Sequence, residues 1–165
     1  MHDTGTGIVI LIADDDVDDC ELAREALNEC RLANQLRFVH DGAQLMNYLR
    51  RRGDFATPGA APRPGLLLLD LNMPKMDGRE ALREIKADPV LCDIPTVILT
   101  TSHAEEDVCR SYKLGANSYV TKPVSFEGLV HVMKSIGRYW FQIVELPPSE
   151  ESDAHGRIAR QSTAR

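Results

Sequence analysis

The chain has 165 residues, of which 43% are hydrophobic and 27% are charged, and its formal net charge is −6. That length suits one domain with a substantial core, and the acidic balance disfavours a nucleic-acid-binding module, which is usually basic. No apolar run approaches the roughly 18 residues of a membrane span. We therefore expect a single cytoplasmic domain over residues 1–146 that contacts neither nucleic acid nor membrane, with its four cysteines as buried thiols.

Strands and helices are predicted to alternate along the chain. Continuous apolar runs predict strands at residues 8–13, 36–39, 66–71, 95–100 and 118–121. Apolar residues at helical spacing predict helices at about 17–31, from Asp41–Gly42 to residues 50–53, at about 77–87, at 104–114 and at 125–146. Glycine and proline make residues 53–65 a surface loop, and the polar residues 147–165 are expected to form a flexible tail. Five such alternations predict an α/β fold with a doubly wound parallel sheet.

Three carboxylates follow two of the predicted strands. Asp14 and Asp15 come directly after the first strand, and Asp70 follows the run Leu66–Leu69. Ligand sites in open parallel sheets lie beyond the carboxyl ends of the strands, so the three side chains should meet in one crevice. Two like charges about 4 Å apart repel by roughly 4 kcal/mol at an effective dielectric of 20. The crevice therefore needs a divalent cation, a lysine, or both.

The remaining strand ends supply the other groups of a phosphoryl-transfer site. Thr100 follows the fourth strand and Lys122 follows the fifth. Mg²⁺ prefers a few carboxylates with waters and a phosphate oxygen, and the backbone carbonyl of Asn72 is a candidate further ligand. With the metal screening its charge, Asp70 can act as a nucleophile and form an acyl phosphate. Lys122 and the Thr100 hydroxyl would then stabilise the transferring oxygens.

From about residue 8 to residue 138 the chain resembles the receiver domain of two-component response regulators. The motifs that carry the resemblance are Asp14–Asp15, the segment Asp70–Gly78 (DLNMPKMDG), Thr100, Tyr119 and Lys122–Pro123. The resemblance implies a flavodoxin-like five-stranded sheet in the order 2-1-3-4-5. It implies that Asp70 receives a phosphoryl group from the phosphohistidine of a sensor histidine kinase and that Asp14 and Asp15 bind Mg²⁺. It also implies that Thr100 and Tyr119 change rotamer as switch residues, and that the Lys122–Pro123 bond is cis.

Two other functions compete with this interpretation. A pseudo-receiver would be an interaction module with an inactive site, and the complete set of acids, threonine and lysine argues against it. A Mg²⁺-dependent phosphatase of the haloacid dehalogenase type would need a second aspartate two residues after the nucleophile, where this chain has Asn72. We therefore expect no enzymatic activity beyond phosphorylation and dephosphorylation of Asp70 itself.

The output of such a protein is expected to be a protein surface. Nothing after Leu146 is long or basic enough to form a DNA-binding domain, so the fourth helix, fifth strand and last helix form the expected output face. The end of the last helix carries more apolar side chains than one core-facing stripe requires. The candidates for a homodimer interface are Tyr139, Trp140, Phe141, Ile143 and Leu146. Alternatively, these side chains pack on the core of the domain itself.

A narrower resemblance concerns the loop near residues 53–64 and the long last helix. Both resemble the small response regulators encoded beside bacterial phytochrome kinases. That resemblance implies a light-sensing histidine kinase as phosphodonor, although the receiver motifs alone fit any sensor kinase.

Overall fold

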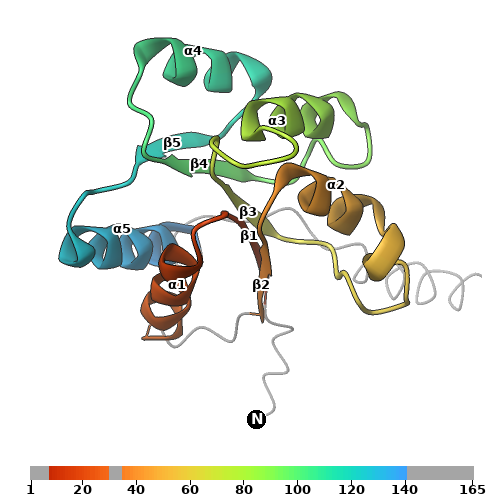
Figure 1. The fold of residues 1–165 in the computed structure, drawn as a ribbon, viewed down its shortest axis with the longest axis horizontal. Coiled ribbons are helices and arrows are strands. Elements are labelled where there is room, and N and C mark those ends of the chain that lie inside the picture. Colours follow the sequence, from red (N-terminus) through yellow and green to blue (C-terminus); the bar gives the residue numbers. More distant parts are fainter. Residues whose placement is uncertain (1–7, 30–34, 141–165) are drawn as a thin grey trace, which may run out of the picture.

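The computed structural model describes residues 8–29 and 35–140, which form a parallel sheet between two layers of helices (Figure 1). The sheet has five strands in the order β2-β1-β3-β4-β5, and all its pairings are parallel, so the predicted α/β fold and strand order are confirmed. The strands are β1 (Val9–Ala13), β2 (Gln35–Val39), β3 (Leu66–Leu69), β4 (Thr96–Thr100) and β5 (Ser118–Thr121).

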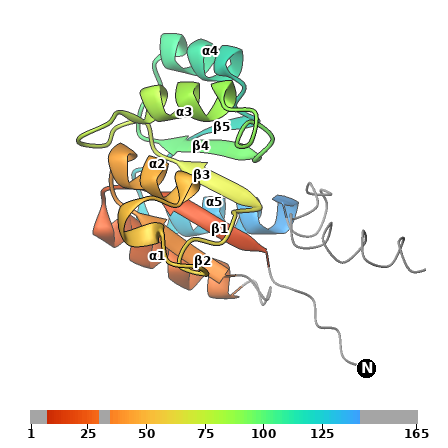
Figure 2. The ribbon, with the colours of Figure 1, turned by 90° about the vertical axis from the view of Figure 1, so that its right-hand side faces the viewer.

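Helices cover both faces of this sheet. Helices α1 and α5 lie on one face, and α2, α3 and α4 lie on the other (Figure 1 and Figure 2). Their bounds are α1 (Val17–Glu29), α2 (Gly42–Arg50), α3 (Gly78–Ala87), α4 (Glu105–Leu114) and α5 (Phe126–Arg138). None of the helices within the described ranges is long and apolar enough to cross a membrane.

The core consists of two apolar clusters, one on each face of the sheet. Successive strand residues point to opposite faces, so Leu67 and Leu69 of β3 pack toward α2 and α3 while Leu66 and Leu68 pack toward α1 and α5. All four of these leucines are buried. A strand buried on both faces has no polar positions, which explains why the continuous leucine run predicted β3 correctly.

Most element ends agree with the sequence-based prediction, because capping residues act locally. The side chain of Asp41 accepts a hydrogen bond from the Gln44 amide at 2.7 Å where α2 begins, and Gly115 ends α4 in the left-handed conformation. The predicted loop 53–65 was wrong in one detail, since Gly53–Phe55 forms one turn of 3₁₀-helix. Two i→i+3 hydrogen bonds form this turn, one from the Phe55 amide to the Arg52 carbonyl and one from the Ala56 amide to the Gly53 carbonyl.

Other predictions need correction or lie outside the described residues. The third strand ends at Leu69, two residues earlier than predicted. Cys20 is buried as expected, but Cys92 and Cys109 are exposed, because they lie in the segment after α3 and on the outer side of α4. The predicted last helix reaches Arg138 within α5, and its continuation to residue 146 and the predicted tail lie outside the described residues.

Gly78 provides a test of how tightly α3 packs against the end of β3. A Cβ atom on Gly78 would lie 2.2 Å from the Asp70 carbonyl oxygen and 2.7 Å from the Leu71 Cα. Because both atoms belong to the backbone, Gly78→Ala is expected to lower the free energy of unfolding by about 3 kcal/mol.

Urea denaturation measures this loss, and Gly59→Ala is the matched control. Gly59 has open space around it and a φ of +82°, so alanine there brings only backbone strain of about 1 kcal/mol. Equal losses in the two variants would contradict the steric explanation.

Candidate functional site

Three carboxylates converge at the carboxyl ends of β1 and β3. One oxygen each of Asp14, Asp15 and Asp70 lies within 4.8 Å of the others. The backbone holds them there, because the Asp70 amide donates to the Ala13 carbonyl at 2.9 Å and so aligns the ends of the two strands. Asp14 and Asp70 are buried, whereas Asp15 is exposed. The predicted convergence is therefore present in the structure.

Lys122 is the counter-charge of this cluster. It follows β5, is 7% exposed, and its Nζ donates to Asp14 Oδ2 at 2.5 Å and to Asp70 Oδ2 at 3.1 Å. The same Nζ also donates to Asp19 Oδ2 at 2.9 Å. Asp19 is not among the residues that the sequence analysis assigns to this site. The first turn of α1 follows β1 directly, and this closeness in the sequence is the signal that could have assigned Asp19 to the site.

The charges of the cluster do not balance. Three carboxylates, those of Asp14, Asp19 and Asp70, contact the ammonium group of Lys122, and a fourth, that of Asp15, lies beside Asp14 and Asp70. Burial raises the pKa of Asp14 to about 6, although the hydrogen bond and charge of Lys122 act in the opposite direction. Burial also disfavours charge on Lys122, but the hydrogen bond that Lys122 donates to Asp14 and the charges of the nearby carboxylates outweigh burial and raise its pKa. Lys122 thus stays protonated, and the crevice retains excess negative charge.

The excess charge and the donor set fit a divalent cation. Carboxylate oxygens are the ligands that hard divalent ions prefer. Asp15 has no hydrogen bond or ion pair to the residues the structure describes, which leaves both of its oxygens available. Asp14, Asp15 and Asp70 are therefore the residues that could hold the ion.

Thr100 contacts Asp70 directly. Its hydroxyl donates to Asp70 Oδ1 at 2.8 Å, and the Asn72 amide donates to the same oxygen at 3.0 Å. Thr100 is fully buried at the end of β4, so few alternative partners are within its reach. Both Asp70 oxygens are thus hydrogen-bonded, one by Thr100 and Asn72 and the other by Lys122.

A chain of contacts runs from Thr100 to Tyr119. The Ser102 amide lies 3.4 Å from Thr100 Oγ1, and the Tyr119 hydroxyl donates to the Ser102 carbonyl at 2.8 Å. The Tyr119 ring is partly buried against the core on the α2–α4 face. Burial raises the pKa of its phenol, so Tyr119 remains a neutral donor.

The sequence interpretation missed an ion pair beside this chain of contacts. Arg79 at the start of α3 donates to both carboxylate oxygens of Asp107 in α4, at 2.7 and 2.6 Å. Asp107 Oδ2 also accepts from the Ser102 hydroxyl at 2.6 Å. The hydrogen bonds from Arg79 and Ser102 lower the pKa of Asp107 to about 2. The pair spans 28 residues, and no local pattern signals it.

One implied feature is absent. None of the peptide bonds in the described ranges is cis, so the implied cis bond at Lys122–Pro123 is wrong for this structure. The trans form is intrinsically favoured before proline by about 0.5–1 kcal/mol. Lys122 reaches the carboxylates with this trans bond.

The predicted interface residues divide into three groups. Trp140 is 8% exposed and packs in the α1–α5 core cluster, so its place on an interface was wrong: the ring fills the end of that cluster. Tyr139 is 50% exposed, and its ring meets that of Trp140 edge-on at 5.6 Å. Phe141, Ile143 and Leu146 lie outside the described residues.

Comparison with known proteins gives the family. The sequence model of the family described as "Response regulator receiver domain" matches residues 10–134 of this chain. The chain belongs to the response regulator receiver family. It is thus a receiver-domain response regulator of a two-component system, with the acidic cluster at the position where the strand ends meet.

Several relatives of this response regulator have solved structures. "Response regulator Rcp1" of Synechocystis sp. is 42% identical over 139 residues, which cover 84% of this chain and 92% of Rcp1. The crystal structure of Mn²⁺-bound Rcp1 has a TM-score of 0.81 over 86% of this chain and 99% of that one. The phosphorylated cyanobacterial phytochrome response regulator RcpA has the same TM-score and coverage at 41% identity. The bacteriophytochrome response regulator RtBRR matches 96% of this chain and 95% of its own, with a TM-score of 0.67 at 39% identity.

Proposed function

We propose that this response regulator receives a phosphoryl group on Asp70 from the phosphohistidine of a sensor histidine kinase, with Mg²⁺ held by Asp14, Asp15 and Asp70. One observation carries the proposal. Asp70 is a buried carboxylate whose oxygens contact Thr100 Oγ1 at 2.8 Å and Lys122 Nζ at 3.1 Å, beside the other acids. This is a nucleophile already surrounded by donors for the oxygens of a transferring phosphoryl group.

The side chains divide the work of the transfer. A carboxylate oxygen of Asp70 attacks phosphorus, the bond from phosphorus to the histidine nitrogen breaks, and that nitrogen takes up a proton. Lys122 and Thr100 then donate to the new phosphoryl oxygens rather than to Asp70 itself. A bound divalent ion neutralises charge on the carboxylates and the phosphoryl group. The backbone carbonyl of Asn72 is our candidate for an additional ligand.

Support for the metal comes from charge and from a relative. Four carboxylates face one ammonium group in the crevice, and the related protein Rcp1 has been crystallised in a Mn²⁺-bound form. Mn²⁺ and Mg²⁺ both suit carboxylate and water ligands. We propose Mg²⁺ as the ion that functions here.

The contacts of Thr100 suggest how phosphorylation alters the surface. If the Thr100 hydroxyl turns toward a phosphoryl oxygen, its contact with the Ser102 amide changes. The Ser102 carbonyl accepts from Tyr119, so the loop after β4 and the ring on β5 move together. We propose that this coupling switches the face formed by α4, β5 and α5, because all these groups lie on or next to it.

The partner proposed for Asp70 is a kinase linked to a phytochrome. Two of the similar proteins support this choice, because RcpA is a cyanobacterial phytochrome response regulator and RtBRR is a bacteriophytochrome response regulator. In this proposal the protein is a phosphoacceptor rather than an enzyme with a separate substrate.

Acetyl phosphate tests the phosphoacceptor function without the kinase. Incubation with acetyl phosphate and Mg²⁺ is expected to add one phosphoryl group, seen in the intact mass, and a chelator is expected to prevent it. Turnover of small phosphate esters without a stable adduct would instead indicate a phosphatase. No adduct under any metal condition would indicate a pseudo-receiver.

We also propose that the α4–β5–α5 face forms a homodimer. Of the six exposed large hydrophobic side chains in the described ranges, four belong to α4 or to α5 and its flanks: Tyr112, Val124, Phe126 and Tyr139. Exposed apolar side chains gathered on one side of a protein are typical of an interaction surface.

Sedimentation velocity checks this interface. Phosphorylation is expected to increase self-association, and Phe126→Glu is expected to weaken it by about tenfold or more. Val90→Glu, at a side chain of similar exposure at the other end of the sheet, should leave association unchanged. A protein that remains monomeric at every concentration, phosphorylated or not, would refute the dimer.

A further inference from the structure

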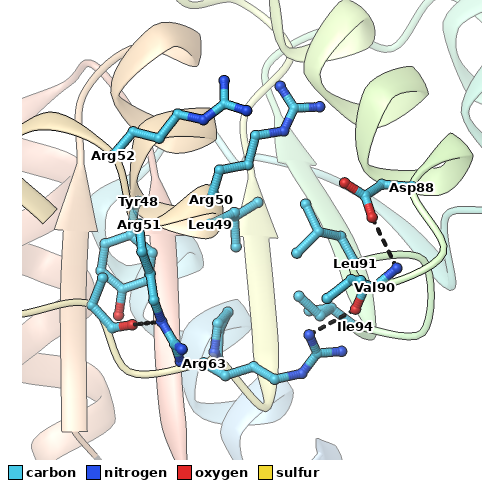
Figure 3. Close-up of a pocket in the computed structure, with 12 residues that line it drawn as sticks. Tyr48, Leu49, Arg50, Arg51, Arg52, Arg63, Asp88, Val90, Leu91 and Ile94 are labelled. Atoms are coloured by element: carbon cyan, nitrogen blue, oxygen red, sulfur yellow. Dashed lines mark hydrogen bonds between the residues drawn. The ribbon is translucent and has the colours of Figure 1, made fainter. Parts of the chain in front are cut away.

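A second candidate site lies at the opposite end of the sheet from Asp70. A cavity of about 380 Å³ is bounded by the end of α2, the loop before β3 and the turn between α3 and β4 (Figure 3). These segments precede β3 and β4, whereas the acidic crevice follows the carboxyl ends of β1 and β3. The cavity is therefore separate from the phosphoacceptor site, and its role does not depend on the function proposed above.

Four arginines line this cavity in a protein of net charge −6. Arg50, Arg51 and Arg52 come from the end of α2, and Arg63 comes from the loop before β3. In Figure 3, Arg50 and Arg52 extend along one side of the cavity, and Arg51 and Arg63 lie at the other. Asp88 is the one carboxylate among the lining residues. The local charge thus favours an anion.

Much of this hydrogen-bonding capacity is unused. Arg52 has no hydrogen bond or ion pair through its side chain within the described part of the chain. The side chain of Arg51 uses only Nε, which donates to the Ala61 carbonyl at 3.1 Å, and that of Arg50 uses only Nη1, which lies 3.1 Å from Glu84 Oε2. Arg63, in contrast, already donates to Asp93 Oδ1 at 2.6 Å and to the Val90 carbonyl at 2.7 Å. Three guanidinium groups therefore have donors available to a ligand.

The floor of the cavity is apolar. Tyr48, Leu91 and Ile94 contribute to it, and each is at most 4% exposed. The Tyr48 hydroxyl is already bonded to the Pro62 carbonyl at 2.8 Å, and burial raises its pKa to about 12, so the ring is neutral. Small-molecule sites combine apolar surface with convergent polar groups, as this cavity does, and its volume lies at the low end of the range of such sites.

The three consecutive arginines have a simpler interpretation, as charges that stabilise the end of α2. That interpretation accounts for Arg50 in the last turn, but not for Arg63, which arrives from another segment. Nor does it explain why Arg51 adopts the left-handed conformation, with φ 53° and ψ 53°, at a position where glycine is favoured. For a residue with a side chain this conformation costs roughly 1–2 kcal/mol. Arg51 thus combines a strained backbone conformation with a position in the lining of the cavity.

We propose that this cavity binds a small organic phosphate with a flat ring system, of the size of a nucleoside monophosphate. The guanidinium groups of Arg50 and Arg52, which extend along the same side of the cavity, match a phosphate group, since each has donors left to form two parallel hydrogen bonds. The ring lies on the floor formed by Tyr48 and Leu91, where the guanidinium plane of Arg51, on the other side of the cavity, can also stack on it.

Three probes measure separately how much the phosphate group and the ring system of such a ligand contribute to binding. Calorimetric titration of the full chain at low salt, with a chelator present, uses AMP, adenosine and inorganic phosphate. AMP is expected to bind, and adenosine and phosphate are each expected to bind at least about tenfold more weakly, because each lacks one half of the contacts. Phosphate binding as tightly as AMP would overturn the role of the apolar floor. No binding of AMP would overturn the proposal as a whole.

Two variants test whether AMP binds in this cavity. Arg51→Gly and Arg52→Gln are each expected to weaken AMP binding about tenfold. Glycine also removes the left-handed strain, so the urea midpoint of Arg51→Gly should not fall with its affinity. Arg138→Gln on α5 and Asp70→Asn in the acidic crevice should retain AMP binding. Equal affinity in all four variants, or loss in Asp70→Asn, would overturn the assignment.

Discussion

Replacement of Asp70 by asparagine is expected to abolish the adduct that acetyl phosphate and Mg²⁺ form with this protein. The amide keeps the shape of the side chain, so the donors Thr100 and Asn72 retain an acceptor and the fold should persist. It lacks the negative oxygen needed to attack phosphorus, and it removes one ligand of the proposed metal. The expected loss is several orders of magnitude in rate, since no other described nucleophile has Lys122 and Thr100 on its two oxygens.

Intact mass spectrometry and the fluorescence of Trp140 measure this loss. Asp18→Asn is the matched control, because Asp18 is exposed in the first turn of α1 and its loss changes the net charge equally. The control should be phosphorylated as in the wild type. An adduct that survives Asp70→Asn would mean that another residue is the acceptor.

Lys122→Met is expected to lower the free energy of unfolding by about 3 kcal/mol in the absence of divalent ions. The methionine removes the ammonium group that contacts Asp14, Asp19 and Asp70, and it leaves the buried carboxylates of Asp14 and Asp70 without their counter-charge. Removal of one partner from a buried ion pair costs roughly 3–5 kcal/mol. Mg²⁺ should restore part of the lost stability, because an ion that binds only the folded protein stabilises it and here also replaces the lost positive charge.

Urea denaturation with and without Mg²⁺ measures both effects. Lys134→Met is the control, since Lys134 forms a surface pair with Glu29 in which both side chains are substantially exposed. Such pairs contribute at most about 1 kcal/mol, so this variant should behave nearly as the wild type. A small loss in Lys122→Met, or the same gain from Mg²⁺ in variant and control, would show that Lys122 does not balance the acidic cluster.

Local patterns predicted most of the fold. Continuous apolar runs marked the strands, and apolar residues at helical spacing, together with terminal signals such as Asp41 and Gly115, marked the helices. These features depend on neighbours a few residues apart, which is why their ends were predicted to within two residues in β2, β3 and β4. The convergence of Asp14 and Asp70 also followed, because parallel strands bring their carboxyl ends to one edge.

Side-chain partners at long range could not be predicted in the same way. The bond from Lys122 to Asp19 spans 103 residues, and the pair Arg79–Asp107 joins two helices that no sequence pattern relates. The burial of Trp140 likewise depends on contacts between elements far apart in the sequence. Its place in an aromatic helix end suggested a surface for a partner, yet the packing of α5 against α1 leaves it inside the core.

The sequence by itself determined the order of the strands and helices, the receiver family and the acids, threonine and lysine at the strand ends. The reason is that periodicity, caps and motifs are encoded in neighbouring residues. Only the tertiary structure decided which donors contact Asp70, that two cysteines are exposed, and that Arg63 joins Arg50–Arg52 around an apolar floor. Those outcomes depend on how separate elements pack and which rotamers fit between them, and the chain specifies that packing only through the fold as a whole.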